Sequence, residues 1–235
     1  MAFTHVQGVS QELQLSGSST VANTYGSATA VDNALTATVT WYGGGTASTC
    51  TVSDSEGNTW IAGTRVESGD TSTFYQQAFY AFATTTGTPT VTATFSAGSP
   101  SSRALLLDEF NESGGKPVFD TEAANNQASP GTGTDAITSG SMTIAQSGSL
   151  VYGFMQLFNG TNNGSAGTGF TLTGTQLTFS ATPYGYSEHK LNQASGTQAA
   201  TFTTSVNQQT FCSGLVFSPP AAGGSIVVLR RRIEA

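Results

Sequence analysis

The chain is poor in charged residues. Asp, Glu, Lys and Arg make up only 9% of its 235 residues, against roughly 25% in a typical soluble domain. Disordered chains are usually highly charged and poor in aromatic residues, whereas this one has 14 Phe, 7 Tyr and 2 Trp, so a folded core is expected. A surface of Thr, Ser, Asn, Gln and Gly is unusual for a freely diffusing enzyme. It fits a protein that packs against copies of itself or is exposed outside a cell.

Residues that carry chemistry are also scarce. His5 and His189 are the only histidines, and Glu188 beside His189 is the one hint of a catalytic or metal-binding group. No nucleophile elbow, Cys–His arrangement or phosphate-binding glycine loop is present. The sequence therefore predicts no enzymatic activity, no cofactor and no metal.

The two cysteines leave three arrangements open. Cys50 and Cys212 could form a disulfide, remain as two buried thiols, or be one of each. Cys212 lies inside the apolar run 211–217, which favours buried, reduced thiols.

Basic residues are few and unevenly placed. The net charge is −7, and three of the seven basic residues are Arg230, Arg231 and Arg232. The acidic body should not bind nucleic acid phosphates non-specifically. No run approaches the roughly 18 apolar residues of a membrane-spanning helix, so no membrane insertion is expected. The start of the chain lacks the basic and apolar pattern of a signal peptide, which predicts synthesis in a cytoplasm and release by lysis or a non-classical route.

What the sequence does have is alternation of threonine with apolar residues. Leu35, Ala37, Val39 and Trp41 interleave with threonines in 35–41, and the same pattern recurs in 91–96. A period of two places one set on the buried face of a β-strand and the other set on its second face. Helical periodicity is essentially absent. The pattern predicts an all-β fold.

Strand-like segments recur every eight to twelve residues between Gly, Pro, Asn and Ser turns, which is typical of a β-sandwich or jelly roll. The expected strands are 11–15, 35–42, 48–53, 58–67, 73–83, 89–96, 103–110, 137–144, 148–158, 168–173, 176–181, 184–191, 198–205 and 208–217. Residues 1–218 are predicted to form one large domain. The turn-rich stretch 112–134 is expected to be a long loop that crosses between sheets or divides the domain in two.

The chain is expected to end in an extended arm over residues 219–235. Pro219 and Pro220 block further strand pairing, and the apolar run Ile226, Val227, Val228, Leu229 follows them. Such a run is an aggregation hazard unless it pairs, so it is predicted to add to a sheet of its own chain or of a neighbour. Together with Arg230, Arg231 and Arg232 it forms the predicted assembly contact, although a solvated tail is the simpler interpretation of the arginines.

Two acidic segments have structural and chemical interpretations. Asp54, Glu56 and Asn58 resemble the front half of a calcium loop, but the downstream bidentate acid is missing, so a hairpin turn with Gly57 at a positive φ is favoured. Asp108 and Glu109 are adjacent on a strand and should face opposite ways. They cannot form a glycosidase acid pair without a partner such as Glu188.

Aromatic side chains offer a second type of site. Trp60, Tyr184 and Tyr186, with Asn162 and Asn163 in the predicted loop 159–169, could form a shallow sugar-binding surface. Aromatic residues in strands are more often core or subunit contacts, and this is the competing interpretation.

Several segments together resemble a known group of proteins. They are CTVSDSEGNTW, FYQQAFYAFATTTGTPTVTATFS, ALLLDEFNES, GSLVYGFM and FCSGLVFSPP, within residues 35–218. In this order they resemble a broad group of β-sandwich proteins of bacterial surfaces and tailed-phage virions. These marks are structural, and they carry no catalytic residues over to this chain.

The resemblance and the missing signal peptide together imply a non-enzymatic virion structural protein assembled in the host cytoplasm. The expected role is capsid decoration (cement) or another head-associated position, with copies of itself and other capsid or tail proteins as partners. The alternative is a carbohydrate-recognition module of a tail fibre, spike or cell-surface protein, which would bind surface glycans during host attachment.

Overall fold

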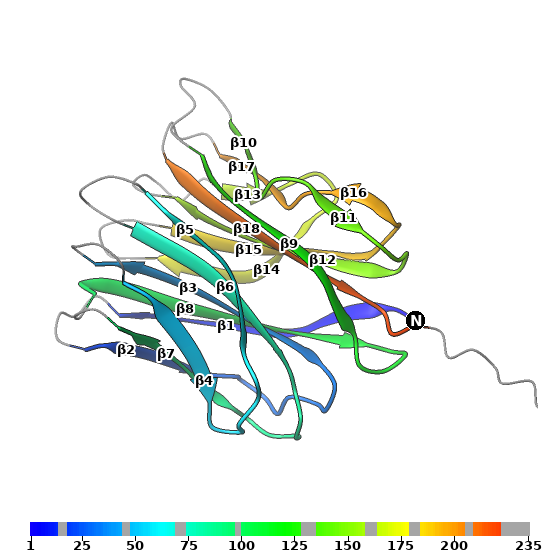
Figure 1. Cartoon of the computed structure of the whole chain (residues 1–235), viewed down its shortest axis with the longest axis horizontal. Coiled ribbons are helices and arrows are strands. Elements are labelled where there is room, and N and C mark those ends of the chain that lie inside the picture. The colour runs from blue at the N-terminus through cyan, green and yellow to red at the C-terminus, as the bar shows by residue number, and fades with distance from the viewer. Residues whose placement is uncertain are drawn as a thin grey trace, which may run out of the picture.

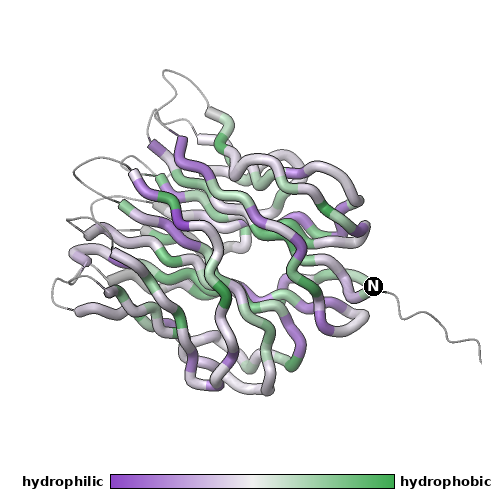
Figure 2. The backbone as a smooth tube through the Cα atoms, viewed as in Figure 1, coloured by the Kyte–Doolittle hydropathy of each residue, from purple (hydrophilic) through white to green (hydrophobic). Residues whose placement is uncertain are grey.

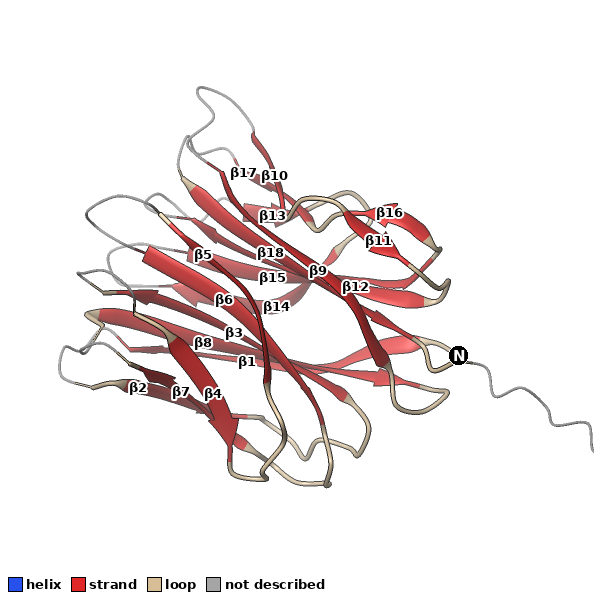
Figure 3. Ribbon diagram, viewed as in Figure 1, coloured by secondary structure: helices blue, strands red, loops and turns tan. Residues whose placement is uncertain are grey.

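The structure is a computed structural model. It describes residues 1–13, 18–43, 48–68, 74–96, 100–127, 135–157, 164–178, 184–204 and 209–221. All regular elements in this part of the chain are β-strands, as Figure 3 shows. The predicted all-β fold class is therefore confirmed.

The first half of the chain forms one five-stranded sheet and one three-stranded sheet, both antiparallel. The large sheet has the order β1-β8-β3-β6-β5, and the small sheet has the order β2-β7-β4. The strands are β1 Phe3–Leu13, β2 Thr20–Thr24, β3 Ala34–Tyr42, β4 Cys50–Asp54, β5 Ile61–Glu67, β6 Phe74–Phe82, β7 Thr90–Phe95 and β8 Ser102–Glu112.

The second half repeats this arrangement. Its large sheet has the order β9-β18-β12-β15-β14, its small sheet has the order β10-β17-β13, and β11 and β16 form an additional pair. The strands are β9 Val118–Gln127, β10 Asp135–Thr138, β11 Met142–Ile144, β12 Ser149–Leu157, β13 Gly164–Ala166, β14 Thr171–Thr178, β15 Tyr184–Gln193, β16 Gly196–Gln198, β17 Thr201–Thr204 and β18 Thr210–Ser218.

Each strand of the first half thus has a counterpart in the second. In chain order, β1, β3, β5, β6 and β8 correspond to β9, β12, β14, β15 and β18, and β2, β4 and β7 correspond to β10, β13 and β17. Eight strands that alternate between two sheets in this way give a jelly-roll-like sandwich. The contacts between the halves are reciprocal, because β1 lies against β14 and β9 lies against β5. Reciprocal contacts are the mark of a two-fold relation.

The molecule therefore has four layers: a small sheet, two large sheets, and the remaining small sheets (Figure 1). One core lies between the small and large sheets of the first half and includes Trp41, Tyr75 and Phe95. A second core lies between the two large sheets and includes Phe110, Tyr152 and Phe217. Two smaller clusters lie under the outer strands of the second half. Apolar segments accordingly run through the middle strands of both large sheets (Figure 2).

The central strands are buried on both faces, which changes the meaning of the threonine alternation. In β3, Thr36, Thr38 and Thr40 are at most 1% exposed, because their face packs against the second half. The alternation correctly predicts a strand there, but the second face is an interior interface. In β7 the expected pattern does hold, since Val91 and Phe95 are buried and Thr94 is exposed.

Several strands lie where the sequence predicts none. Strand β9 falls inside the predicted loop 112–134, and β13 falls inside the predicted loop 159–169. Strand β2 lies between the expected strands, and β1 begins at Phe3 rather than at residue 11. These segments are edge or outer strands with few apolar residues, so their hydrophobic period is weak. Strand β9, the first strand of the second set of sheets, begins at Val118, after a short turn that follows Glu112.

The last described strand ends next to the two prolines, and the cysteines are as the sequence favoured. Strand β18 ends at Ser218, immediately before Pro219. Cys50 and Cys212 are both free and buried, which confirms the reduced thiols. Burial raises the pKa of Cys50 to about 12 and also raises the pKa of Cys212. The predicted arm residues Ile226 to Arg232 lie outside the described residues.

Because the two halves share one core, we expect them to unfold together. Phe217 in β18 is fully buried in that core and contacts Tyr80 of the first half at a centroid distance of 5.6 Å. The variant Phe217→Ala should lower the free energy of unfolding by about 3 to 5 kcal/mol through the cavity it leaves. Urea unfolding followed by tryptophan fluorescence should keep a single transition, although both tryptophans lie in the first half. An unchanged midpoint for that fluorescence transition would show that the halves are independent.

Candidate functional site

A buried polar cluster lies between the two large sheets where β1 meets β14. His5 Nε2 is 3.0 Å from Asp108 Oδ1, and the hydroxyl of Tyr152 donates to Asp108 Oδ2 at 3.2 Å. Asp108 is 0% exposed, whereas the side chain of His5 is 18% exposed. Of these three residues, only His5 at the edge of the cluster therefore reaches solvent.

Hydroxyl groups extend this cluster across both halves. Thr38 of β3 contacts the hydroxyl of Tyr152 at 3.3 Å, and Ser187 of β15 bonds to Asp108. Thr173 of β14 bonds to Ser187 in turn. Burial raises the pKa of Asp108, and the bonds from His5, Ser187 and Tyr152 oppose that rise. Burial, with the Asp108 charge beside it, raises the pKa of Tyr152 well above its ordinary value.

The two histidines come together in this cluster, although 184 positions separate them in the sequence. The rings of His5 and His189 are stacked with centroids 5.0 Å apart, and the ring of Phe110 lies edge-on to His189 at 5.8 Å. Burial, and then the nearby His5, lower the pKa of His189 to about 4. Nδ1 of His189 is buried and has no hydrogen-bond partner among the described residues. No local sequence signal announces this pair, because only the packing of β1 against the second half creates it.

The corresponding place on the other side of the interface contains no histidine. By strand register, Phe119 corresponds to His5, Phe217 to Phe110, and Tyr80 to His189. The rings of Tyr80 and Phe119 are likewise stacked, at 4.3 Å, and the ring of Phe217 is likewise edge-on to Tyr80, at 5.6 Å. Of the two equivalent triads, only the one with His5 and His189 contains imidazole groups.

The cluster's geometry does not suit nucleophilic catalysis. The serine bonds to Asp108, whereas a triad requires a serine bonded to the histidine. Asp108, Tyr152 and Ser187 are each at most 1% exposed, so a substrate would have to separate the sheets to reach them. The arrangement can instead respond to acid, because it holds two imidazoles in contact.

Glu188 faces away from this cluster. Its carboxylate accepts hydrogen bonds from the backbone N–H groups of Gly167 and Thr201, each at 3.0 Å. It thereby joins the large sheet of the second half to its outer strands. Burial raises its pKa to about 8, opposed by those two bonds and by Lys190. Ser187 faces Asp108, and its neighbour Glu188 faces the opposite layer. Asp108 and Glu188 therefore do not form the glycosidase acid pair that the sequence left open.

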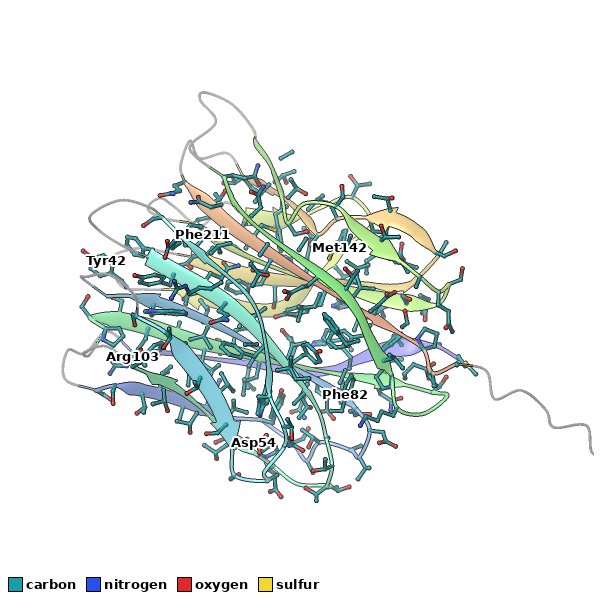
Figure 4. All side chains as sticks on the ribbon, in the orientation of Figure 1. Tyr42, Asp54, Phe82, Arg103, Met142 and Phe211 are labelled. Carbon is teal, nitrogen blue, oxygen red and sulfur yellow. The ribbon has the colours of Figure 1, made fainter. Side chains whose placement is uncertain are left out.

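The acidic segment after β4 is a turn, as the sequence favoured. Asp54 Oδ1 accepts the backbone N–H groups of Glu56 and Asn58, at 3.0 and 3.1 Å. Its Oδ2 accepts the side-chain N–H groups of Asn58 and Trp60, at 2.9 and 2.7 Å. Gly57 has a φ of 75°. The carboxylate is fully engaged in the turn, which explains the spacing from Asp54 to Trp60; Figure 4 labels Asp54 at this end of the first half.

The two predicted sugar-binding aromatic side chains that the structure describes, Trp60 and Tyr186, do not form a common surface. Tyr186 is 4% exposed and packs in the core of the second half, so the sugar-stacking prediction is wrong for this residue. Trp60 packs partly against the core of the first half, and its indole N–H is bonded to Asp54. Asn162 and Asn163, and the side chain of Tyr184, lie outside what the structure describes.

A pocket of about 230 Å³ opens at the start of β9. Its lining is mostly apolar: Val118, Phe119, Ala145, Pro219 and Ala221, together with Asp120, Gln146 and Ser218. Asp120 Oδ2 accepts bonds from the backbone N–H of Ala145 and the hydroxyl of Ser218, at 2.8 and 2.9 Å. Asp120 and Ser218, two of the three polar residues of the lining, thus bond to each other, and no sequence pattern predicts the pocket.

Other kinds of site are not formed by the described residues. Within those ranges no three His, Cys, Asp or Glu side chains are grouped so that they could hold a metal ion. The same part of the chain contains no helix long and apolar enough to cross a membrane.

Comparison with known proteins gives no match: no family model fits the chain, and neither the curated proteins nor the solved structures contain a similar one. The structure therefore supports the β-sandwich part of the expected resemblance, and no comparison supports its bacterial-surface or virion part.

The stacked histidines predict a specific response to acid. An unfolded imidazole has a pKa of about 6.5, whereas that of folded His189 is about 4. Between these values the imidazole of His189 binds more protons in the unfolded chain, so His189 contributes a loss of stability as the pH falls through this window, which the raised pKa values of Glu188 and Asp108 oppose. In His189→Phe that loss should shrink by roughly 2 to 3 kcal/mol between pH 6.5 and 4, measured as the free energy of unfolding in urea.

The equivalent triad supplies the matched control. Tyr80→Phe changes the residue that corresponds to His189 by strand register and adds no titratable group. Its unfolding free energy should keep the wild-type dependence on pH. If His189→Phe and Tyr80→Phe gave parallel pH profiles, the acid response would not come from His189.

Proposed function

We propose that this chain is a non-enzymatic structural protein of a bacteriophage particle, specifically a capsid decoration or head-associated protein. Its partners would be copies of itself and other virion proteins, and it would be assembled into particles in the host cytoplasm. The sequence marks between residues 35 and 218 support the virion assignment. The outer face of the sheet β2-β7-β4 supports the assembly role and is the single observation on which that role depends.

This outer face consists of small, uncharged side chains in register. Strand pairing aligns Thr94 of β7 with Thr20 and Thr51, and it aligns Thr92 with Ala22 and Ser53. A further row joins Thr24 to Thr90, whose hydroxyls lie 2.8 Å apart. We call these eight residues the threonine face: Thr20, Ala22, Thr24, Thr51, Ser53, Thr90, Thr92 and Thr94.

A surface of this kind suits close contact with another protein. Burying an unpaired charge costs several kcal/mol, whereas a hydroxyl can rotate to find a donor or an acceptor. The threonine side chains are β-branched and therefore stiff, so little rotamer freedom is lost when they are covered. The buried core beneath them, including Val21, Val91 and Ala93, holds the face in a fixed shape.

A single copy of such a face binds with modest affinity, and the repetition of the contact on a particle raises the overall affinity. On a symmetric shell each copy meets an equivalent site, and linked or oligomeric copies raise the effective concentration of the next contact. This mechanism needs no cofactor and no catalytic group. Because Trp60 is bonded within its own turn and Tyr186 is buried, the described residues favour assembly over glycan recognition.

The first test is the copy number of this chain in purified particles from its source, by quantitative mass spectrometry. A number comparable to that of the major capsid subunit is expected for a decoration protein. A number that matches a fibre or baseplate would contradict the head position. Absence of the chain from particles would overturn the virion proposal.

The second test places a charge at the centre of the threonine face. Thr92→Lys should abolish binding of the purified protein to particles that lack it, because the lysine must be desolvated without a partner. Thr203→Lys is the matched control, since Thr203 occupies the middle strand β17 of the opposite outer sheet. Cosedimentation measures both variants. Equal loss in the two would show that the threonine face is not the contact surface.

A further inference from the structure

We propose that the pocket at the start of β9 binds the apolar segment Ile226–Leu229 of a second copy of this chain. The inference names a self-contact within the proposed assembly role and rests on that role for its biological meaning. Its physical basis is separate from the threonine face, because it depends on the pocket, on the chain that follows Ala221, and on charge.

The pocket has the chemistry of an apolar docking site. Val118 at its rim is 53% exposed and is among the few exposed large apolar side chains of the described residues. The Asp120 carboxylate, the Ser218 hydroxyl and the Ala145 N–H already bond to one another. An apolar occupant therefore leaves no polar group of that set without a partner. The volume of about 230 Å³ also suits aliphatic side chains, since a cavity of roughly 150 Å³ accepts benzene.

The segment that follows the described chain has the matching chemistry. Four apolar residues, Ile226, Val227, Val228 and Leu229, follow Ala221 after a short Gly-containing stretch. In an extended segment alternate side chains point to opposite sides, so one pair, Val227 and Leu229, can enter the pocket beside the exposed Val118. Strand β9 is the edge strand of its sheet, and its first residues, Val118 to Asp120, line the pocket, so an added strand can also use backbone groups at this end.

Charge favours the same encounter. The segment is followed by Arg230, Arg231 and Arg232, and the chain before it has four basic residues against thirteen acidic ones. Asp120 lies in the lining of the pocket itself. The basic end of one copy is thus attracted to the acidic body of another, which steers the apolar segment toward an acidic surface.

A second copy is a better donor of the segment than the chain itself. Only residues 222–225 separate Ala221, which lines the pocket, from Ile226. A segment folding back over that span would have to pair with Pro219 and Pro220, which lack the N–H groups that a strand ladder needs. The segment of another molecule approaches without that constraint.

Disulfide trapping between two purified variants tests the contact. One chain carries Val118→Cys at the pocket rim, and the other carries Val227→Cys in the segment. After mixing and mild oxidation, a covalent dimer containing one chain of each kind is expected. Cys50 and Cys212 can stay in place, because both are buried and burial raises the pKa of each thiol.

The matched control uses Val31→Cys in place of Val118→Cys. Val31 is 49% exposed and lies in the first half, between β2 and β3. Mixed with Val227→Cys it should give no more dimer than random collision gives. Equal trapping by the two exposed positions would overturn the proposal.

A chain that carries both Val118→Cys and Val227→Cys separates the two possible donors. Intermolecular docking predicts covalent dimers and longer chains, whereas an intramolecular disulfide in monomers at high dilution would overturn the second-copy assignment. As an independent measurement, the wild-type chain should self-associate in sedimentation velocity, and a chain ending at Ala221 should not.

These results are separable from those on the virion role. Trapping and sedimentation use purified protein without particles. If Thr92→Lys no longer binds particles but still gives the disulfide-trapped dimer, both the threonine-face contact and the pocket contact are supported. If the chain gives the trapped dimer but is absent from particles, the self-contact stands and the virion proposal is overturned.

Discussion

The structure depends on the packing of its two large sheets against each other. Strands β3, β8, β12 and β18 are covered on both faces, so each half would expose a wide apolar surface without the other. Phe110 and Phe217 occupy corresponding positions in this contact, and β1 and β9 close its two edges against β14 and β5. An isologous interface inside one chain removes the concentration dependence that a dimer of separate halves would have. The outer sheets then provide the sheet faces that are available for contacts with other molecules.

The strand periodicity in the sequence predicts the fold class well but not the layers. Alternation in β3 marks a strand correctly, yet the same alternation occurs in β7, where the threonines face outward. What differs is tertiary: Thr38 finds Tyr152 of the other half, and no local pattern contains that information. Strand β9 was missed because Thr121, Glu122, Asn125 and Asn126 give it the composition of a loop. Its pairing with the buried β18 overrides its weak intrinsic preference.

The sequence also does not reveal that the second half repeats the fold of the first, because corresponding positions hold different residues. Corresponding positions hold Ala37 and Gly153, or Tyr80 and His189, so burial is shared while identity is not. One local trace survives in the irregular pairings of β5 and β14, which contain Gly63-Thr64 and Gly174-Thr175 respectively. The site residues depend on the same long-range packing. Asp54 and Trp60 could be read from their spacing because the turn is local, whereas His5 and His189 meet only after both halves have folded.

The differences between the two halves indicate where the chain is adapted beyond folding. Packing alone is satisfied by the triad of Phe119, Phe217 and Tyr80, so the histidines in the equivalent triad are not required to fill space. Their cost appears in His189, whose buried Nδ1 has no partner among the described residues. A neutral imidazole is tolerated there at neutral pH, and a charged one is not. Protonation of His189 therefore disfavours the packing at the edge formed by β1 and β14, whereas the corresponding edge formed by β5 and β9 has a triad without histidine.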